Sequence, residues 1–237
     1  YTAKGRTGRR IRREAVSDNY RGTRHTPFEM QVASEPWPVP DGWIAGDAHV
    51  HTDYTRDQVE FGPPVAAIAD MSRAMGIGWA ALTDHSYDLD DAQDDYLAAD
   101  DDLPRWHDLG RDIADAESDI CLIRGEEVSC GNSRGENIHL LALGIETFIP
   151  GSVDGGERAT IVRPELTLQQ AITAIHDQDG VAIAAHIGAR PSWVERITFR
   201  RGAWGGDDVV APDLDALQTW NSERGHELDS ALAEWVR

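Results

Sequence analysis

Cysteine is almost absent from this chain, which has only Cys121 and Cys130 among its 237 residues. Two cysteines are too few for the disulfide framework that stabilises small secreted domains. We therefore expect both to be buried strand residues, with a single disulfide as the less favoured alternative. Stability must come from a hydrophobic core, and a hydrophobic content of 41% over this length is sufficient for one large domain.

Long hydrophobic runs are also missing. No apolar stretch approaches the roughly 20 residues that a membrane-spanning helix requires, so we predict no membrane span. No signal peptide is recognisable, and because the chain begins with Tyr1 we expect a processed or excerpted product. The sequence leaves the compartment open, either cytoplasmic or exported with the signal removed, and it leaves the oligomeric state open.

Basic residues are scarce, with 22 lysines and arginines against 42 acidic residues and a net charge of −20. This balance disfavours nucleic-acid binding through a broad basic surface, and an anionic substrate would need local metal ions or arginines. Eight of the basic residues lie within residues 1–25. We predict a basic, extended arm over residues 1–35 and a single domain over 36–237. A flexible leader is favoured over a tether for an acidic partner or nucleic acid.

Apolar runs of strand length alternate with helical patterns after a proline-rich segment at 36–40. This alternation predicts an α/β fold with a mainly parallel sheet or barrel. The acidic segment 88–102 is expected to be a solvated loop, and Thr167 with Gln170 is a capping box at a helix start. The expected strands are 43–49, 78–83, 120–128, 138–143, 181–185 and 216–220, and the other expected helices are 63–75, 103–116 and 223–235.

Histidines and carboxylates follow several of these strands. His49 and His51 are separated by one residue, so on a strand both rings project to the same side. Residues that follow different parallel strands meet at one face of an α/β barrel. The other polar residues at strand ends are Asp53, Asp57, Asp84, His85, Glu126, Glu127, His139 and His186. Imidazole and carboxylate together suit zinc, manganese or iron(II), and a bridging carboxylate would create a multinuclear hydrolytic site.

Five short motifs occur in a recognisable order. They are Asp47-Ala48-His49-Val50-His51-Thr52, Leu82-Thr83-Asp84-His85, Gly125-Glu126-Glu127-Val128, Asn137-Ile138-His139 and Ala185-His186. Together they resemble the PHP (polymerase and histidinol phosphatase) superfamily over about residues 43–237. The carbaryl-hydrolase-like group is the most similar, because there a Gly-Glu-Glu-Val block precedes a histidine and a Leu/Gly-rich strand. The resemblance implies a distorted (β/α)7 barrel that holds two to three divalent ions.

The resemblance also implies roles for individual residues. His49 and His51 would bind the first ion, and Glu127 would bridge it to a second. The remaining implied ligands are His85, His139 and His186, with Asp57 at a position where the family often has a third-site ligand. Asp84 would be a catalytic-site residue, either as a ligand or by orienting His85. Glu126 points away from Glu127 on a strand and is not expected to bind metal.

The chain departs from the family at its end. The late Ser-Asp-x-His block of the family is absent before Arg237. We expect a fragment cut inside the domain, so that the last strand and helix of the barrel are missing as well. The alternative is a site that lacks two of its expected ligands.

The predicted function is that of a metal-dependent hydrolase that uses metal-activated water, in the first place a phosphoesterase acting on a small molecule. One alternative keeps the metal site and changes the substrate to a carbamate, amide or carboxylic ester. A second alternative is a non-catalytic metal-binding module or a fragment of a larger protein. Arg190 follows His186 in a loop and is a candidate to clamp a phosphate or carboxylate, against an ordinary salt bridge. Asn221 could likewise face the site.

Overall fold

The computed structural model describes residues 2–4, 10–12, 39–56, 62–93, 95–116, 119–151 and 163–219. The chain divides into two compact units, Tyr1–Trp43 and Ile44–Arg237. In the first unit, strands β1 (Thr2–Lys4) and β2 (Arg10–Arg12) form an antiparallel pair. The rest of the predicted arm and the helix expected at 223–235 lie outside the described residues. The division into an arm and a domain at residue 35 stays a prediction.

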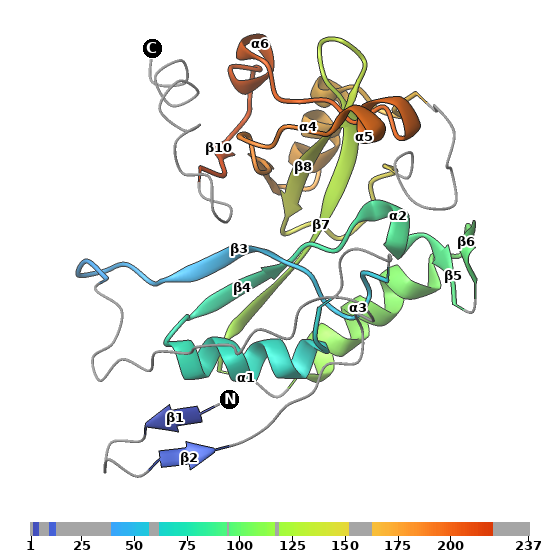
Figure 1. Ribbon diagram of the computed structural model, residues 1–237. Coiled ribbons are helices and arrows are strands. Elements are labelled where there is room, and N and C mark those ends of the chain that lie inside the picture. Colours follow the sequence, from blue (N-terminus) through green and yellow to red (C-terminus); the bar gives the residue numbers. More distant parts are fainter. Residues whose placement is uncertain are drawn as a thin grey trace. The chain divides into compact units, whose positions relative to one another are not determined.

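A mixed sheet of six strands lies at the centre of the second unit, in the order β10-β9-β8-β7-β4-β3. Its strands are β3 (Gly46–Val50), β4 (Trp79–Leu82), β7 (Cys121–Gly131), β8 (Asn137–Leu143), β9 (Val181–Ala184) and β10 (Ala216–Leu217). The sheet curls as a half-barrel (Figure 1). The α/β class is confirmed, and a curled half-barrel is compatible with part of a barrel.

The sheet is mainly parallel, as expected, with β8 as the exception. This strand runs antiparallel to both β7 and β9, whereas β3, β4 and β7 are parallel to one another and β9 is parallel to β10. The reason is the short connection 132–136 between β7 and β8. A parallel neighbour needs a crossover of about a dozen residues or more, so a connection of this length can only make a hairpin.

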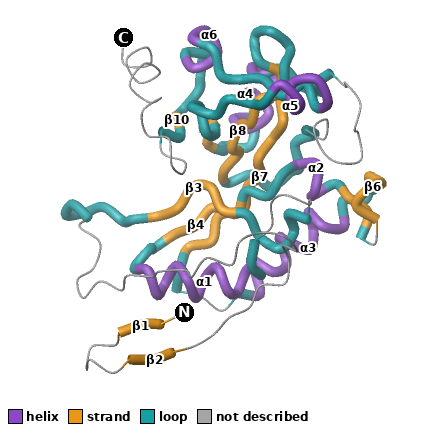
Figure 2. The backbone as a smooth tube through the Cα atoms, in the orientation of Figure 1, coloured by secondary structure: helices purple, strands orange, loops and turns teal. Residues whose placement is uncertain are grey.

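Strand β7 joins the two halves of the sheet, as the long orange segment of Figure 2 shows. Its first residues, 121–124, pair with β4, and residues 125–131 pair with β8. Gly125 lies where the partner changes. A Cβ atom at this position would lie 2.4 Å from the carbonyl oxygen of Ala142, so the close approach of the two strands requires glycine.

Three longer helices cover the sheet: α1 (Val65–Met75), α3 (Pro104–Asp115) and α4 (Leu168–His176). Helix α1 lies within the predicted range 63–75. It follows Pro63-Pro64 and ends at Gly76, whose φ of 76° is left-handed. The predicted capping box of Thr167 and Gln170 is also present at the start of α4. The shorter helices are α2 (Ser86–Leu89), α5 (Trp193–Thr198) and α6 (Gly206–Val209).

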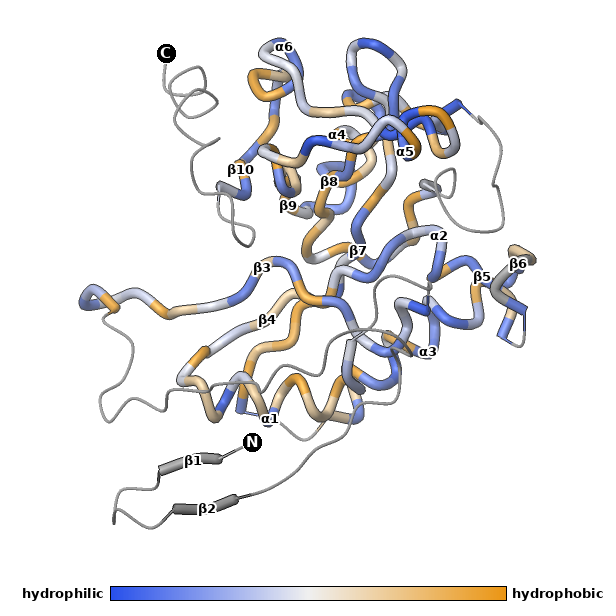
Figure 3. The backbone as a smooth tube through the Cα atoms, in the orientation of Figure 1, coloured by the Kyte–Doolittle hydropathy of each residue, from blue (hydrophilic) through white to orange (hydrophobic). Residues whose placement is uncertain are grey.

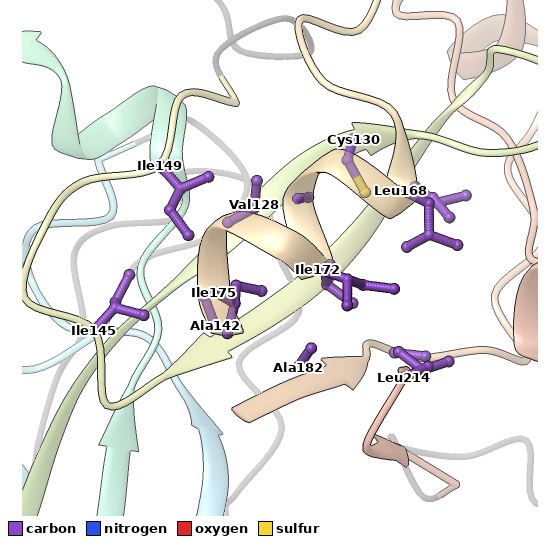
Figure 4. Close-up of a cluster of buried hydrophobic side chains, with 14 of the residues drawn as sticks. Val128, Cys130, Ala142, Ile145, Ile149, Leu168, Ile172, Ile175, Ala182 and Leu214 are labelled. Atoms are coloured by element: carbon purple, nitrogen blue, oxygen red, sulfur yellow. The ribbon is translucent and has the colours of Figure 1, made fainter. Parts of the chain in front are cut away.

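The main core lies between α4 and the strands β7, β8 and β9. Leu168, Ala171, Ile172 and Ile175 form the buried stripe of α4, as the helical spacing predicts. Figure 4 shows side chains of this helix close to Val128, Cys130, Ala142 and Ala182 from the three strands. Burying each large aliphatic side chain contributes about 1.5–3 kcal/mol. In Figure 3 much of β8 is orange, as expected of a strand that is buried along its whole length.

The acidic segment 88–102 differs from the solvated loop that we expected. It contains the antiparallel strands β5 (Asp91–Ala92) and β6 (Asp95–Ala99), and Asp88, Asp90 and Asp91 are buried. Burial of several carboxylates requires a compensating charge, which the equally buried Arg105 of α3 supplies.

Three smaller expectations also need comment. Cys130 is buried as predicted, but Cys121 is exposed because it begins β7 at the rim of the sheet, and both are free thiols. The first strand begins only at Gly46, and the preceding Trp43 and Ile44 are exposed. Among the described residues, no helix is long and apolar enough to cross a membrane.

Candidate metal centre

Five histidine rings surround the carboxylate of Glu127, which is almost completely buried. The rings of His49, His51 and His85 approach its Oε2 at 3.0, 3.1 and 3.3 Å. The rings of His139 and His186 approach its Oε1 at 2.6 and 2.7 Å. Six of the seven residues named as ligands in the sequence analysis are thus brought together, and the seventh, Asp57, lies outside the described residues. Their role as ligands stays a prediction.

Local structure explains how residues distant in sequence converge. In the antiparallel ladder, Glu127 is opposite Leu141 and Ser129 is opposite His139, so Glu127 and His139 point to the same face. His85 forms a parallel bridge with Glu127 directly after β4. His186 follows β9 with a φ of 30°, which is rare for a residue other than glycine. Such strain persists only where neighbouring contacts enforce it.

The proton of the His49 ring can be placed from its neighbours. The backbone N–H of His186 donates to Oε1 of Gln218 at 2.7 Å. The same oxygen lies 3.0 Å from Nδ1 of His49, so Nδ1 must carry a proton and donate it. In a neutral imidazole the other nitrogen, Nε2, is then unprotonated, and its lone pair points at Glu127.

The same reasoning holds for His51. The hydroxyl of Thr55 donates its only proton to Oδ1 of Asp84 at 2.7 Å. It must therefore accept a hydrogen bond from Nδ1 of His51, which lies 2.9 Å away. The Nε2 atom of His51 is again the unprotonated nitrogen.

Three lone pairs consequently face one another. The Nε2 atoms of His49 and His51 are 3.1 Å apart, and both lie within 3.1 Å of Glu127 Oε2. Lone pairs at this distance repel unless a positive charge lies between them, and a proton or a metal ion can provide it. The residues present therefore fit a divalent cation. The groups His49, His51, Glu127 and His85, Glu127, His139 each have their ligand atoms within 4.8 Å of one another, and each could hold an ion. Because Glu127 belongs to both groups, its carboxylate can bridge two ions.

The electrostatics of the centre are dominated by Glu127. Burial alone would raise the pKa of its carboxyl, but the surrounding rings of His49, His139 and His85 outweigh burial and lower that pKa well below its usual range. Burial likewise disfavours the charged form of His49, yet the charge and the hydrogen bond of Glu127 raise the pKa of this ring. For His186 the effect of burial prevails, and its pKa is lowered.

Asp84 lies beneath the centre. It is fully buried and accepts four hydrogen bonds, two each from Thr52 and Thr55, at 2.7–3.0 Å. These bonds use the oxygens of Asp84 to fix the loop after β3. Through Thr55 they also fix the ring of His51 rather than that of His85, which was the expected partner. The catalytic role predicted for Asp84 stays untested, and its geometry is that of a positioning group.

A cavity of about 120 Å³ lies beside the centre. His139 and His186 line one side of it, and Arg190, the predicted anion clamp, lines another. Arg201 also lines the cavity, and its Nη2 is 3.3 Å from Nε2 of His139. The role of Arg190 as a clamp stays a prediction, and Asn221 lies outside the described residues.

Sequence reasoning missed three residues that contact the centre: Thr55, Arg201 and Gln218. Gln218 comes directly after β10, so the rule that selected the other strand-end residues could have found it. Thr55 and Arg201 lie in loops without a motif. No pattern in the sequence indicates that they contact His51 and His139.

Comparison with known proteins adds little. No family model and no curated protein matches the chain. Among solved structures, a protein from Bifidobacterium adolescentis that has been proposed to be a metal-dependent phosphoesterase is similar, with a TM-score of 0.47 and 16% identity. The similarity covers 81% of this chain and 84% of that chain.

Proposed function

We propose that this chain is a metal-dependent hydrolase that holds two to three divalent cations around Glu127. The observation that carries the proposal is the convergence of three potential ligand atoms, Nε2 of His49, Nε2 of His51 and Oε2 of Glu127, within 3.1 Å of one another. A structural network of histidines would alternate donors and acceptors. For His49 and His51 the outer Nδ1 atoms donate to Gln218 and Thr55, which leaves the inner Nε2 atoms unprotonated when the rings are neutral.

The residues of the centre divide into two sets by what they do. Glu127 with His49, His51, His85, His139 and His186 would hold the ions. Asp84 holds Thr55, and Thr55 and Gln218 keep the protons of His51 and His49 on the nitrogens that face away from Glu127. Divalent cations in such a site supply Lewis-acid activation of water and stabilise negative charge on the reacting group. Imidazole with carboxylate favours zinc, manganese or iron(II) as the ion.

A phosphoester is the proposed substrate class. The ordered set of motifs that resembles the PHP superfamily supports it, and so do the two arginines that line the cavity beside His139 and His186. The net charge of −20 provides no long-range attraction for an anion, so these local cations are what an anionic substrate would meet. The competing substrates are carbamates, amides and carboxylic esters, whose reacting group carries no negative charge.

The test combines metal analysis with substrate assays. Protein purified without chelator or affinity-tag metal should contain two to three equivalents of a divalent metal by elemental analysis. Glu127→Ala and His49→Ala should lose the metal together, whereas the matched control His107→Ala, at an exposed histidine of α3, should keep it. Parallel assays on a phosphomonoester, a phosphodiester, an aryl ester and an aryl carbamate then identify the substrate class.

Each outcome has a definite meaning. One equivalent of metal or less in the wild-type chain would overturn the proposed multinuclear centre. Full metal content with turnover of the aryl ester or carbamate alone would reject the phosphoesterase and leave the metallohydrolase. Full metal content with no turnover of any substrate would favour a non-catalytic metal-binding module.

A further inference from the structure

The cavity beside the centre is separated from Glu127 by one imidazole ring. Nδ1 of His139 is 2.6 Å from Glu127 Oε1, and Nε2 of the same ring is 3.3 Å from Nη2 of Arg201. These nitrogens lie on different edges of the ring. A group bound at Arg201 would therefore be distinct from the group that reacts next to Glu127, although both would touch His139.

The charge of the cavity has the opposite sign to that of the chain. Arg190 and Arg201 contribute two positive charges, and Glu195 contributes one negative charge. Nη1 of Arg201 is 3.6 Å from Oε1 of Glu195, so the two side chains form an ion pair. The pair keeps Arg201 in place and leaves a local positive excess, which favours an anion.

Two polar atoms of cavity-lining residues are left without hydrogen bonds. Asn137 and Trp204 are 1% and 8% exposed, and both line the cavity. Within the part of the chain that the structure describes, Oδ1 of Asn137 and Nε1 of Trp204 are buried and have no hydrogen-bond partner. Buried polar groups are nearly always paired, so unpaired ones beside a cavity indicate a bound water or ligand group. The indole N–H can donate to an anionic oxygen, and the amide oxygen can accept from a hydroxyl or water.

We propose that this cavity is a second substrate subsite, which binds a non-reacting anionic oxygen group, carboxylate or phosphate, through Arg201, Arg190 and the indole N–H of Trp204. The inference rests on the proposed function. It goes further by stating that the substrate carries two separated anionic groups, one at Glu127 and one at Arg201. The cavity volume of about 120 Å³ has room for a compact carboxylate or phosphate group.

Binding of two non-hydrolysable phosphonates tests the subsite. In 3-phosphonopropionate a carboxylate replaces the terminal methyl of propylphosphonate, and the two compounds otherwise match. Isothermal titration of the full, metal-loaded chain should show tighter binding of 3-phosphonopropionate. Arg201→Gln should weaken binding of that compound roughly 10-fold to 100-fold and leave propylphosphonate unchanged, since only the charge-assisted contact is lost.

Control variants separate binding from folding. Arg196→Gln, at an exposed arginine of the same region that pairs with Glu136 at 3.6 Å, should bind both compounds as the wild type does. Arg190→Gln is a second variant at an exposed position, and it should weaken only 3-phosphonopropionate, by several-fold. Metal content and melting temperature are measured for each variant, so that a loss of metal or of folding is recognised. If Arg201→Gln loses either, the binding data of Arg190→Gln decide whether the subsite exists.

Three results would overturn the subsite. The first is equal affinity of the wild type for both phosphonates. The second is an equal loss of affinity for both phosphonates in the arginine variants, and the third is unchanged affinity for both in these variants. Failure of the proposed function looks different. If the chain contains no metal and turns over no substrate, but its arginines still favour 3-phosphonopropionate over propylphosphonate, the subsite is supported and the proposed hydrolase function is rejected.

Discussion

Glu126 and Glu127 are consecutive residues of β7 and both are completely buried, yet their carboxyl groups are in opposite electrostatic states. Glu127 is surrounded by imidazole rings, which outweigh burial and lower its pKa well below the usual range. Glu126 points to the other face of the strand. There burial dominates and raises its pKa to about 8, although it accepts hydrogen bonds from the Ile149 N–H and the Ser86 hydroxyl.

The difference shows that burial does not by itself determine what a carboxylate does. On one face of β7, nitrogen lone pairs and an ionised carboxylate create a position for cations. On the other face, burial keeps the Glu126 carboxyl largely protonated near neutral pH, where it accepts from the Ile149 N–H and the Ser86 hydroxyl. Strand alternation alone assigns the two residues to these two environments.

Replacing Glu127 should have the largest effect on metal content and activity, because it removes the charged carboxylate from one of the two faces of β7. Glu127→Gln keeps the volume and removes the charge that both ligand groups share, and its amide N–H would compete with a cation for the histidine lone pairs. We expect metal content to fall below half an equivalent, and hydrolysis of a phosphoester to fall by about three orders of magnitude or more. Elemental analysis and an initial-rate assay measure the two quantities.

The neighbouring residue is the matched control for that variant. Glu126→Gln changes the same residue type one position away and should retain the metal. Loss of metal in both variants would mean that the strand, rather than the Glu127 carboxylate, had been disturbed. Retention of metal in Glu127→Gln would remove the basis for a bridging carboxylate.

A smaller effect should follow from removing the support of His51. Thr55→Val keeps the shape of the side chain and deletes the hydroxyl that accepts from His51 Nδ1 and donates to Asp84. The ring then loses the contact that fixes its tautomer, and metal affinity should fall roughly 10-fold to 100-fold. Competition with a chromophoric chelator measures the affinity.

Thr173→Val is the control for Thr55→Val, because Thr173 is an exposed threonine of α4 whose hydroxyl bonds only to the Gln169 carbonyl. It should leave the metal affinity unchanged. If Thr55→Val binds metal as tightly as Thr173→Val does, the hydroxyl of Thr55 does not position His51.

Much of the candidate centre could be predicted from the sequence because its residues obey local rules. His49 and His51 share a strand face, and His85, Glu127 and His186 come at or near strand ends, where alternation with helices brings them together. The same reasoning gave α1 and α4 with their caps, since Pro64, Gly76 and the Thr167–Gln170 pair act within one helical turn.

The remaining features depend on contacts between distant segments. The burial of Asp88 and Asp91 requires Arg105 from the next helix, which no local pattern reveals. Arg201 reaches His139 across 62 positions of the sequence. The antiparallel course of β8 is different, because the five-residue connection before it predicts a hairpin, and the resemblance to a barrel obscured this signal.

The smallest expected effect concerns the pH dependence of stability, and it tests whether the carboxyl of Glu126 is protonated in the folded chain. Its folded pKa of about 8 lies above the unfolded value near 4.3, so between these pH values the folded state holds a proton that the unfolded state has released. The free energy of unfolding should therefore decrease as pH rises from about 4.3 to about 8, and Glu126→Gln should remove this contribution. The glutamine can still accept from the Ile149 N–H, and its amide can donate to the Ser86 hydroxyl, so the core geometry is kept.

Urea unfolding at pH 5, 6.5 and 8, with chelator present so that metal binding does not contribute, measures the difference between Glu126→Gln and the wild type. We expect the free energy of unfolding of the variant to increase relative to that of the wild type as pH rises from 5 to 8. Glu146→Gln, at an exposed glutamate, should show no such trend. A wild-type and a Glu126→Gln curve that remain parallel across this range would mean that Glu126 ionises as easily in the folded chain as in the unfolded one. The contrast between the two faces of β7 would then rest on Glu127 alone.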